Sequence, residues 1–473
     1  NAVLICHAVS GDSHCAAHDA EDDPGWWDVV VGPGKPIDTD RYFVICPNIL
    51  GGCRGTTGPN CTNPATGRPY GADFPIITVG DIVEVHRLLI DHLGIETLLA
   101  VTGGSMGGHQ VLSWAMRYPG RARGVIPLAT SPRMTSQALA FDIVGRNAIV
   151  EDPNFHGGQY YSAPSGPTTG LAIARMIGHI TYLSRQSMAR KFEADRYQPR
   201  DGSTDFENRF SIGSYLGYQG EKFVERFDAN SYITLTTAMD LFDMGTEPRE
   251  LAAQLAAADA RWLIVSFSSD WLFPPDQSDR LVDALLATDK PVSCCNVDSS
   301  CGHDAFLLPD DLDSYGELVR AFLANVNGEG PARPPTDSGR VHTSPTSIFH
   351  TQRLDYDHIV ELVPPNTSVL DLGCGGGELL SLLKERGNSP LLGVELDEQA
   401  IVTCVGRGLD VVQADLNAGL DRFGDRQFDF VLLSHTLQAI RDVERIVADM
   451  LRVGRRCIVS FPNFAYRKLR EML

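Results

Sequence analysis

Short apolar runs alternate with helix-like segments along most of the chain. Examples are RYFVICPNI, TLLAVTGG, GVIPLAT and RWLIVSFSS in the first part, and SVLDLGCG, LLGVELD and FDFVLLS in the second. Strands that are apolar along their whole length and alternate with helices are typical of parallel sheets covered by helices on both faces. The pattern therefore predicts an α/β fold in both parts of the chain.

The two parts are separated by a segment of different composition, residues 325–347. This segment is rich in Pro, Gly, Ser and Thr and has no apolar periodicity, which is typical of an extended linker. We therefore predict a domain at 1–325, a linker at 326–348 and a second domain at 349–473. The sequence starts inside a predicted strand and without a methionine, so we expect a truncated N-terminus.

One region of the first domain departs from the alternation. From about residue 136 to residue 240 there is almost no strand signal, and helix-like segments such as GLAIARMIGHITYLSRQSMARKF follow one another. Ligands of α/β folds bind at the carboxyl edge of the sheet. We therefore expect a helical lid at about 136–240 that covers this edge.

A serine between glycines is the first candidate for chemistry. Ser105 is the central residue of GGSMG, between the predicted strand LLAVTGG and the predicted helix GGHQVLSWAMRY. In such a turn the serine has a strained backbone, its hydroxyl projects above the sheet, and glycines let the chains pass each other. The N–H of Met106, at the positive end of the helix, would then face a developing oxyanion. This context favours a nucleophile over a simple glycine turn.

A serine nucleophile needs a base and an acid that orients the base, in the chain order Ser, Asp, His for this type of fold. Asp270 follows the predicted strand RWLIVSF, and His303 lies in a Gly-containing loop after the next predicted strand. We expect both to reach the same sheet edge as Ser105. The loop after the first strand, around Ser10, would supply the second oxyanion donor.

Several long motifs of residues 1–325 resemble the homoserine O-acetyltransferase (MetX) family: CHAVSGDSH, NILGGCRGTTGPNCTNPATGRPYGADFP, GGSMGGHQVLSWA, SSDWLFPP and GHDAFL. The resemblance implies an α/β-hydrolase fold with a helical lid. It also implies ping-pong transfer of an acyl group from acyl-coenzyme A to the hydroxyl of an amino acid, L-homoserine. Ser105, Asp270 and His303 match the family's nucleophile, acid and base, and acyl transfer of this kind requires no cofactor.

The same resemblance implies three substrate-binding residues. The family holds its amino acid with an arginine, a tyrosine seven residues later and the aspartate after the catalytic histidine, which match Arg175, Tyr182 and Asp304. A guanidinium binds an α-carboxylate bidentately and a carboxylate accepts from the α-ammonium, so that the side-chain hydroxyl stays free to attack. Serine as acceptor, succinyl-coenzyme A as donor, or ester or thioester hydrolysis by the same triad are the alternatives.

The second domain contains a glycine-rich turn after its first predicted strand. TSVLDLGCGGG includes Asp371, Gly373 and Gly375, and the next predicted strands end at Glu395 and Asp415. Such glycines let a ligand approach the backbone, and an acid at the next strand end suits the hydroxyls of a ribose. These residues predict a Rossmann-like domain that binds S-adenosylmethionine.

Residues 353–473 resemble the MetW family of methionine biosynthesis, through RLDYDHIVELVPP and TLQAIRDVERIVADMLRVGRRCIVSFPNF. The resemblance implies a methyltransferase-like fold without a defined methyl acceptor, and a supporting role beside the acyltransferase. Feedback by S-adenosylmethionine is one hypothesis, and a true methyltransferase is the alternative. The sequence stops before the last strands of such a domain, so we expect a truncated C-terminus.

The composition limits the classes of molecule that the protein is expected to bind. The formal net charge of −20 argues against nucleic acid or an anionic membrane as partner. The 11 cysteines form no CxxC pair, so we expect reduced thiols in a cytoplasmic protein and no zinc site. His7 and His14 share a loop, but neither a carboxylate nor a cysteine follows them at ligand spacing, and we expect no metal. We expect a homodimer.

Overall fold

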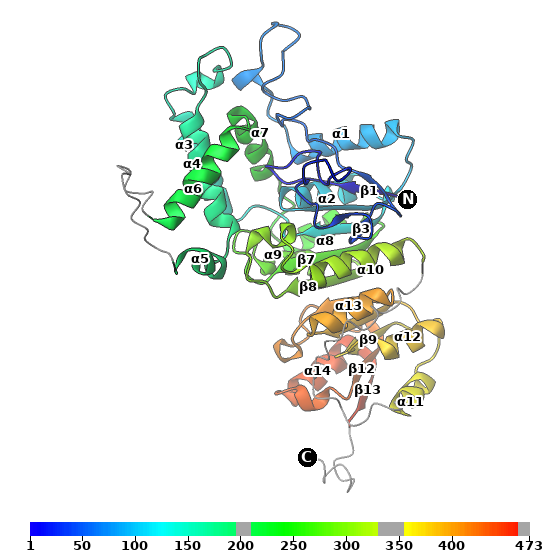
Figure 1. Cartoon of the computed structure of the whole chain (residues 1–473). Coiled ribbons are helices and arrows are strands. Elements are labelled where there is room, and N and C mark those ends of the chain that lie inside the picture. The colour runs from blue at the N-terminus through cyan, green and yellow to red at the C-terminus, as the bar shows by residue number, and fades with distance from the viewer. Residues whose placement is uncertain (195–209, 330–353, 462–473) are drawn as a thin grey trace. The chain divides into compact units, whose positions relative to one another are not determined.

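The computed structural model describes residues 1–194, 210–329 and 354–461 (Figure 1). Residues 330–348 of the predicted linker therefore lie outside the described residues. Within the described residues no helix is long and apolar enough to cross a membrane. They form two compact units. The first consists of Asn1–Thr288 and Asn296–Arg320, and the second of Asp289–Cys295 and the described residues from Ala321 onward.

The first unit contains strands in the order β4-β1-β5-β6-β7, followed by β8, of which only Asn296 and Val297 belong to this unit. Its strands are β1 (Ala2–Ile5), β4 (Phe43–Ile45), β5 (Leu98–Gly104), β6 (Ala122–Leu128), β7 (Arg261–Phe267) and β8 (Val292–Val297). The neighbours from β4 to β7 pair in parallel. Every residue of β1 and β5 is buried, as predicted for strands covered on both faces. Parallel pairing brings the loops after β1, β5 and β7 to one edge.

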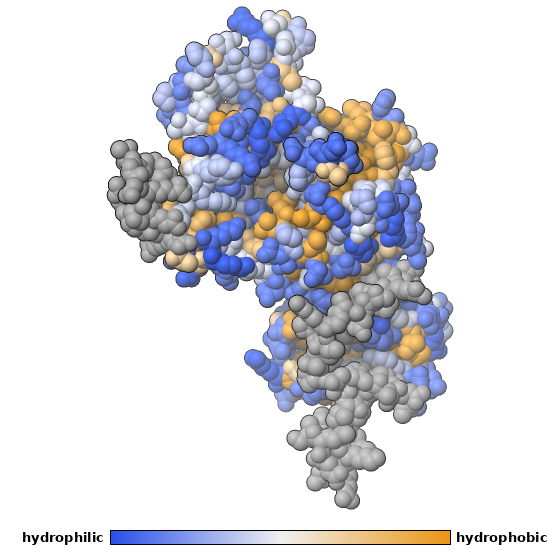
Figure 2. All heavy atoms as spheres, in the orientation of Figure 1, coloured by the Kyte–Doolittle hydropathy of each residue, from blue (hydrophilic) through white to orange (hydrophobic). Residues whose placement is uncertain are grey.

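Helices connect and cover these strands. They are α1 (Val79–His92), α2 (Met106–Arg117), α8 (Pro248–Leu255), α9 (Pro275–Leu286) and α10 (Glu317–Val326), and a short parallel pair, β2 (Val31–Gly32) and β3 (Ile37–Asp38), lies outside the main sheet. α2 packs on β5 and β6, which explains why it is buried from Met106 to Ala115. α1 is more superficial, and Figure 2 shows apolar residues on the surface over it, where Val85 and Leu88 are exposed.

The segment between β6 and β7 is helical where the structure describes it. It contains α3 (Ser136–Val150), α4 (Thr168–Tyr182), α5 (Arg185–Phe192), α6 (Ser211–Val224) and α7 (Ala229–Asp240), and residues 195–209 of the predicted lid lie outside the described residues. α4 packs between α3 and α6 (Figure 1). One apolar cluster joins these helices to the sheet edge and includes Val9, Met106, Ala174, Phe223, Leu235 and Phe273. Packing of this kind excludes water from the edge.

The second unit has its own parallel sheet, in the order β11-β10-β9-β12-β13. Its strands are β9 (Val369–Leu372), β10 (Leu391–Glu395), β11 (Asp410–Gln413), β12 (Phe428–Ser434) and β13 (Gly454–Ser460), and its helices are α11 (Leu354–Leu362), α12 (Glu378–Glu385), α13 (Glu398–Gly406) and α14 (Val443–Val453). Within the unit this is the order 3-2-1-4-5 of doubly wound folds, which bind ligands where the order reverses. The glycine loop after β9 lies at that point.

Buried histidines make the stability of the first unit depend on pH. Burial lowers the pKa of His86 to about 3, and neither of its ring nitrogens has a hydrogen-bond partner among the described residues. His86 is therefore neutral in the folded chain, whereas an unfolded histidine binds a proton below pH 6.5. We expect the free energy of unfolding to fall by roughly 2 kcal/mol between pH 7 and pH 5 because of His86 alone.

The measurement is urea unfolding followed by tryptophan fluorescence, which reports the first unit because all five tryptophans lie in it. His86→Leu removes this contribution, so the variant should lose less stability than the wild type between pH 7 and pH 5. Equal losses in the two proteins would contradict the assignment.

Candidate active site

Ser105 occupies a strained turn between β5 and α2. Its backbone angles are φ 59° and ψ −126°, in a region that a residue with a side chain rarely adopts. Hydrogen bonds hold this conformation: the N–H of Ser105 donates to the carbonyl oxygen of Leu128 (3.1 Å), and Thr130 Oγ1 donates to the carbonyl oxygen of Ser105 (3.0 Å). The turn is therefore fixed by the end of β6, and the Ser105 side chain is 7% exposed.

The neighbouring glycines are needed because other backbone comes very close. A Cβ atom on Gly103 would lie 2.4 Å from the carbonyl oxygen of Cys6, and one on Gly107 would lie 2.1 Å from it. A Cβ atom on Gly104 would lie 2.5 Å from the ring of Phe306. The glycine pattern of the motif thus results from close packing against the loop after β1 and against the segment that contains the predicted base.

The predicted acid and base are hydrogen-bonded to each other. His303 Nδ1 lies 2.7 Å from Asp270 Oδ2, and each residue is 2% exposed. The other oxygen of Asp270 accepts from the N–H groups of Leu272 (3.0 Å) and Phe273 (2.9 Å). Because Nδ1 is the donor to Asp270, the second ring nitrogen of a neutral His303 carries no proton. His303 can therefore accept a proton at Nε2.

The pKa of His303 results from two opposing effects. Burial disfavours the imidazolium form, but the negative charge of Asp270 and its hydrogen bond outweigh burial, and the pKa of His303 is raised above 6.5. A neighbouring carboxylate that stabilises the imidazolium makes the imidazole a better proton acceptor. The pair therefore has the electrostatics expected of a general base and the acid that orients it.

The base loop is anchored to the last turn of α4. Gly302, directly before His303, forms an antiparallel bridge with Leu183, and a Cβ atom on Gly302 would lie 2.6 Å from the carbonyl oxygen of Tyr182. The ring centroids of Tyr182 and His303 are 6.0 Å apart, and that of Phe273 is 5.0 Å from His303. The helical segment thus fixes one side of the imidazole, which nothing in the motif GHDAFL predicts.

The loop after β1 is held by a buried histidine. His7 Nδ1 donates to the carbonyl oxygen of Ala8 (2.8 Å), and its Nε2 accepts from the N–H of Ile49 (3.3 Å). Gln110 of α2 donates to the carbonyl oxygen of His7 (3.0 Å), and burial lowers the pKa of His7. The neutral His7 side chain therefore joins this loop to Ile49, and the His7 backbone joins it to α2. Sequence reasoning missed this role, because a histidine next to a strand gives no signal of it.

The two predicted oxyanion donors lie on these connected segments. Met106 is the first residue of α2, so its N–H has no partner within the helix. Ser10 is fixed by two arginines: its Oγ accepts from Arg175 (3.3 Å), and its carbonyl oxygen accepts from Arg226 (3.0 Å). The contact between Arg226 and Ser10 joins segments that are far apart in the sequence, so it could not be predicted.

The three predicted substrate residues gather beside His303. The guanidinium of Arg175 lies 5.6 Å from the ring centroid of Tyr182 and 4.8 Å from that of Phe223. Burial raises the pKa of Asp304, although the positive charges of His303 and Arg175 act to lower it. Arg175 also lines a hollow of about 650 Å³ with Ser10 and Phe223. A polar cluster thus connects this hollow to the base.

The second unit has a separate hollow of about 650 Å³ at the end of its sheet. Gly373, Glu395 and Asp415 line it, as their positions at strand ends predict. Gly375 donates its N–H to Glu395 Oε2 (2.7 Å) and so joins the glycine loop to the acid. Asp371 is buried within β9. The hollow and its two carboxylates have the form of a nucleoside site at the reversal point.

Comparisons with known proteins identify both parts. The family model "alpha/beta hydrolase fold" matches residues 1–310, and the model "Methionine biosynthesis protein MetW" matches residues 353–473. A "Bifunctional methionine biosynthesis protein MetXA/MetW" of Rhodopirellula baltica is 53% identical over 481 residues, which cover all of this chain and 75% of that protein. The chain belongs to this MetXA/MetW family.

Relatives of the MetXA part alone have two different names. A "Homoserine O-acetyltransferase" of Desulfotalea psychrophila is 51% identical and covers 69% of this chain and 84% of its own length. A "Homoserine O-succinyltransferase" of Alkalilimnicola ehrlichii is 50% identical and covers 70% of this chain and 86% of its own length. Overall similarity to these relatives therefore does not distinguish the two acyl groups.

Solved structures confirm the α/β-hydrolase fold of the MetXA part. The homoserine O-acetyltransferase from Bacillus anthracis has a TM-score of 0.60 at 30% identity, over 68% of this chain and 88% of that chain. A structure named esterase E22 has a TM-score of 0.62 at 30% identity, over 68% of this chain and 89% of that chain. The fold alone therefore does not distinguish a transferase from an esterase.

The electrostatics of the pair predict the pH dependence of Ser105 acylation. We expect an acyl-enzyme to form from p-nitrophenyl acetate only when His303 is neutral, so the rate of the nitrophenol burst should fall as the pH drops through the raised pKa of His303. Asp270→Asn removes the charge that raises this pKa, and burial then dominates. We expect a midpoint below 6.5 and a rate lower by roughly 10⁴-fold. An unchanged midpoint in Asp270→Asn would contradict the assignment.

Proposed function

We propose that the first unit transfers an acetyl group from acetyl-coenzyme A to the hydroxyl of L-homoserine. Ser105 is the nucleophile and His303 is the general base. Asp270 orients His303 and raises its pKa. The observation that carries the proposal is the buried hydrogen bond between His303 Nδ1 and Asp270 Oδ2, at the sheet edge where Ser105 occupies its strained turn. Acyl transfer of this type needs no cofactor.

The first half of the reaction forms an acyl-enzyme. His303 Nε2 takes the proton of the Ser105 hydroxyl while Oγ attacks the thioester carbonyl carbon. The N–H groups of Met106 and Ser10 donate to the oxyanion. When the tetrahedral intermediate collapses, the carbon–sulfur bond breaks and the coenzyme A thiol leaves with the proton from His303. The acetyl group is then an ester of Ser105.

The second half reverses these roles with a different nucleophile. The homoserine hydroxyl gives its proton to His303 Nε2 and attacks the ester carbonyl carbon, and the bond to Ser105 Oγ breaks. Ser105 regains the proton from His303, and O-acetyl-L-homoserine leaves. Each proton that His303 accepts is thus returned within the same half-reaction.

Arg175, Tyr182 and Asp304 position the acceptor. Arg175 is fixed by Ser10 and by two aromatic rings, so its guanidinium can bind an α-carboxylate without first becoming ordered. The Asp304 carboxylate takes the α-ammonium, and Tyr182 lies beside His303. Since the α-carboxylate and the α-ammonium are both held, the side-chain hydroxyl is the group left to react at the base.

The packing around the site supports transfer over hydrolysis. The apolar cluster between the sheet edge and the helices includes Val9, Met106 and Phe273, which flank the oxyanion loop, the nucleophile and the acid. A site enclosed in this way limits competition by water for the acyl-enzyme. Serine as acceptor and succinyl-coenzyme A as donor are the closest alternatives. Serine is one methylene shorter than homoserine, and a pocket distinguishes such neighbours by only ~1–3 kcal/mol.

The test is release of free thiol from acetyl- or succinyl-coenzyme A by the full chain, with L-homoserine, L-serine or no acceptor. We expect release that depends on acetyl-coenzyme A and homoserine, and a loss of roughly 10⁴-fold or more in Ser105→Ala. Release at the same rate without an acceptor would show a hydrolase instead. Faster release with succinyl-coenzyme A would identify succinyl-coenzyme A, not acetyl-coenzyme A, as the donor. Faster release with L-serine would identify L-serine, not L-homoserine, as the acceptor.

Arg175→Lys is the matched variant for substrate positioning, because it keeps the charge and loses the planar fork. It should raise KM for homoserine roughly 10-fold or more and change the nitrophenol burst of Ser105 much less, because Arg226 still holds the carbonyl oxygen of Ser10. A burst that falls together with the homoserine reaction would mean that Arg175 supports the triad rather than the acceptor.

For the second unit we propose S-adenosylmethionine binding in the hollow at Gly373, with Glu395 and Asp415 facing the nucleoside. The two carboxylates at successive strand ends support this proposal. The unit then acts as a binding module through which this downstream product of methionine biosynthesis regulates acyl transfer, and no methyl acceptor is assigned. Homodimer formation and a cytoplasmic location remain predictions from the sequence.

Titration calorimetry of the full chain with S-adenosylmethionine tests this module. Glu395→Gln should weaken binding by roughly 10-fold or more. Glu385→Gln, which changes an exposed carboxylate at the end of α12, should have no effect. Absence of binding in the wild type, or binding without any effect on thiol release, would refute regulation by this ligand. Methyl transfer that persists in Ser105→Ala would instead show a true methyltransferase.

A further inference from the structure

A loop of the first unit forms one wall of the hollow beside Ser10 and Arg175. Asp12, His14 and the segment Asp22–Pro24 line this hollow. Between residues 12 and 23 the sequence contains five carboxylates and two histidines, with no lysine or arginine. Asp12 is paired with Arg54 (3.4 Å), so the negative charge that can attract a cation lies on the residues from 19 to 23. The proposed acyl transfer uses none of these residues.

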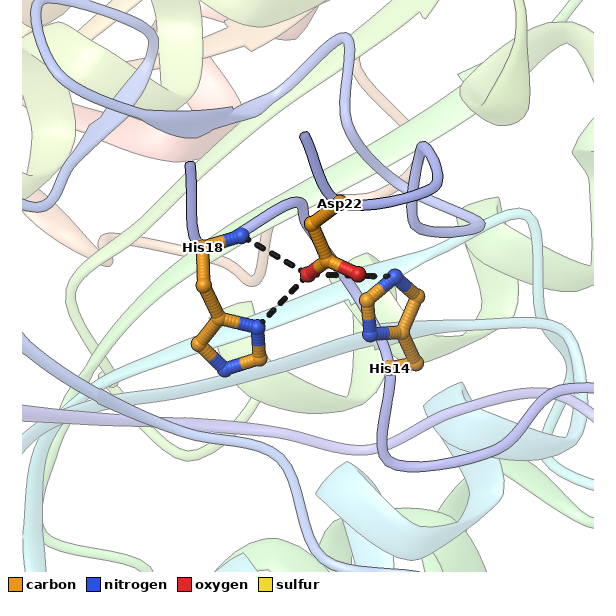
Figure 3. A group of neighbouring side chains, drawn as sticks. All are labelled: His14, His18 and Asp22. Carbon is orange, nitrogen blue, oxygen red and sulfur yellow. Dashed lines mark hydrogen bonds and ion pairs between the residues drawn. The ribbon is translucent and has the colours of Figure 1, made fainter. Parts of the chain in front are cut away.

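Three side chains of the loop converge on one point (Figure 3). His18 Nδ1 lies 2.8 Å from Asp22 Oδ2, and His14 Nε2 lies 3.8 Å from the same oxygen. The three potential ligand atoms all lie within 4.8 Å of one another. His14 Nε2 is also 2.7 Å from the carbonyl oxygen of Asp23. Two imidazole nitrogens and one carboxylate oxygen thus face a common centre, and the carbonyl oxygen of Asp23 lies beside one of these nitrogens.

The backbone holds these ligands in place without a metal. Trp26 donates its N–H to the carbonyl oxygen of His14 (3.1 Å), and Trp27 donates to that of Cys15 (2.9 Å). Trp27 is fully buried and its indole N–H donates to the carbonyl oxygen of Phe306 (2.8 Å). Because the loop is anchored in the core at this end, an ion would meet a largely preformed set of donors.

We propose that His14, His18 and Asp22 bind one divalent transition-metal ion, with Zn²⁺ the best match. Imidazole nitrogens combined with a carboxylate suit zinc, whereas magnesium and calcium prefer oxygen ligands throughout. The ion takes the place of the protons now shared between the rings and the oxygens. The side chain of His18 is 82% exposed and can adjust its ring to complete the site.

The sequence predicts no metal at His7 and His14, and these two residues do not form the proposed site together. His7 is occupied by Ala8 and Ile49, and the partners of His14 come from four and eight residues further along the chain. The bound ion would join these segments and so stiffen the wall of the hollow next to Ser10. It has no step in acyl transfer, because the triad residues are not among its ligands.

The experiment uses the full chain after removal of metals with a chelator. Zn²⁺ is titrated in competition with a chromophoric chelator, and Co²⁺ is added separately so that its visible absorption reports nitrogen ligands. We expect the wild type to bind one more equivalent than His18→Ala, or to bind it at least about 10-fold more tightly. Zn²⁺ should also raise the melting temperature of the wild type and not that of His18→Ala. Mg²⁺ should neither bind at this site nor raise the melting temperature of the wild type.

His358→Ala is the matched control. His358 is an exposed histidine that faces a single carboxylate, Glu361 at 3.8 Å, and it belongs to no group of three potential ligands among the described residues. This variant should bind Zn²⁺ like the wild type. An unchanged melting temperature of metal-free His18→Ala would verify that the variant is folded. Equal zinc stoichiometry and affinity in the wild type and His18→Ala would overturn the proposal.

Discussion

The site of the first unit depends on one short hydrogen bond, the 2.7 Å contact between His303 Nδ1 and Asp270 Oδ2. It selects the tautomer of His303, it supplies the charge that offsets the desolvation of the imidazole, and it leaves Nε2 as the proton acceptor. Two backbone N–H groups hold the other oxygen of Asp270. The carboxylate therefore keeps its orientation when the imidazolium forms, and no reorganisation is needed during the reaction.

Much of the fold serves to bring three loops close to this pair. Gly103 and Gly107 pack against the loop after β1, and Gly104 packs against Phe306 in the base segment. Gly302 packs against the end of α4. The glycines thus transmit the positions of nucleophile, oxyanion loop and base to one another, and the helices between β6 and β7 are part of that arrangement rather than a separate cover.

The parallel strands and the loops that follow them were predictable, because a parallel sheet has one carboxyl edge and buried strands are recognisable as apolar runs. That rule was sufficient to propose Ser105, Asp270 and His303. The roles of His7 and Arg226 were not predictable, since each depends on a contact between segments distant in the sequence. The group of His14, His18 and Asp22 depends on a loop that folds back on itself, and such loops have no periodicity to reveal which side chains meet.

The central claim is that Ser105 carries the acyl group between the two substrates. The most direct measurement mixes the full chain with acetyl-coenzyme A alone and locates the added mass by peptide mapping. We expect one acetyl group on the peptide that contains Ser105 and none in Ser105→Ala. Addition of L-homoserine should rapidly remove this acetyl group from the wild type. A wild-type chain that acetylates homoserine without any acetyl group appearing on Ser105 would contradict it.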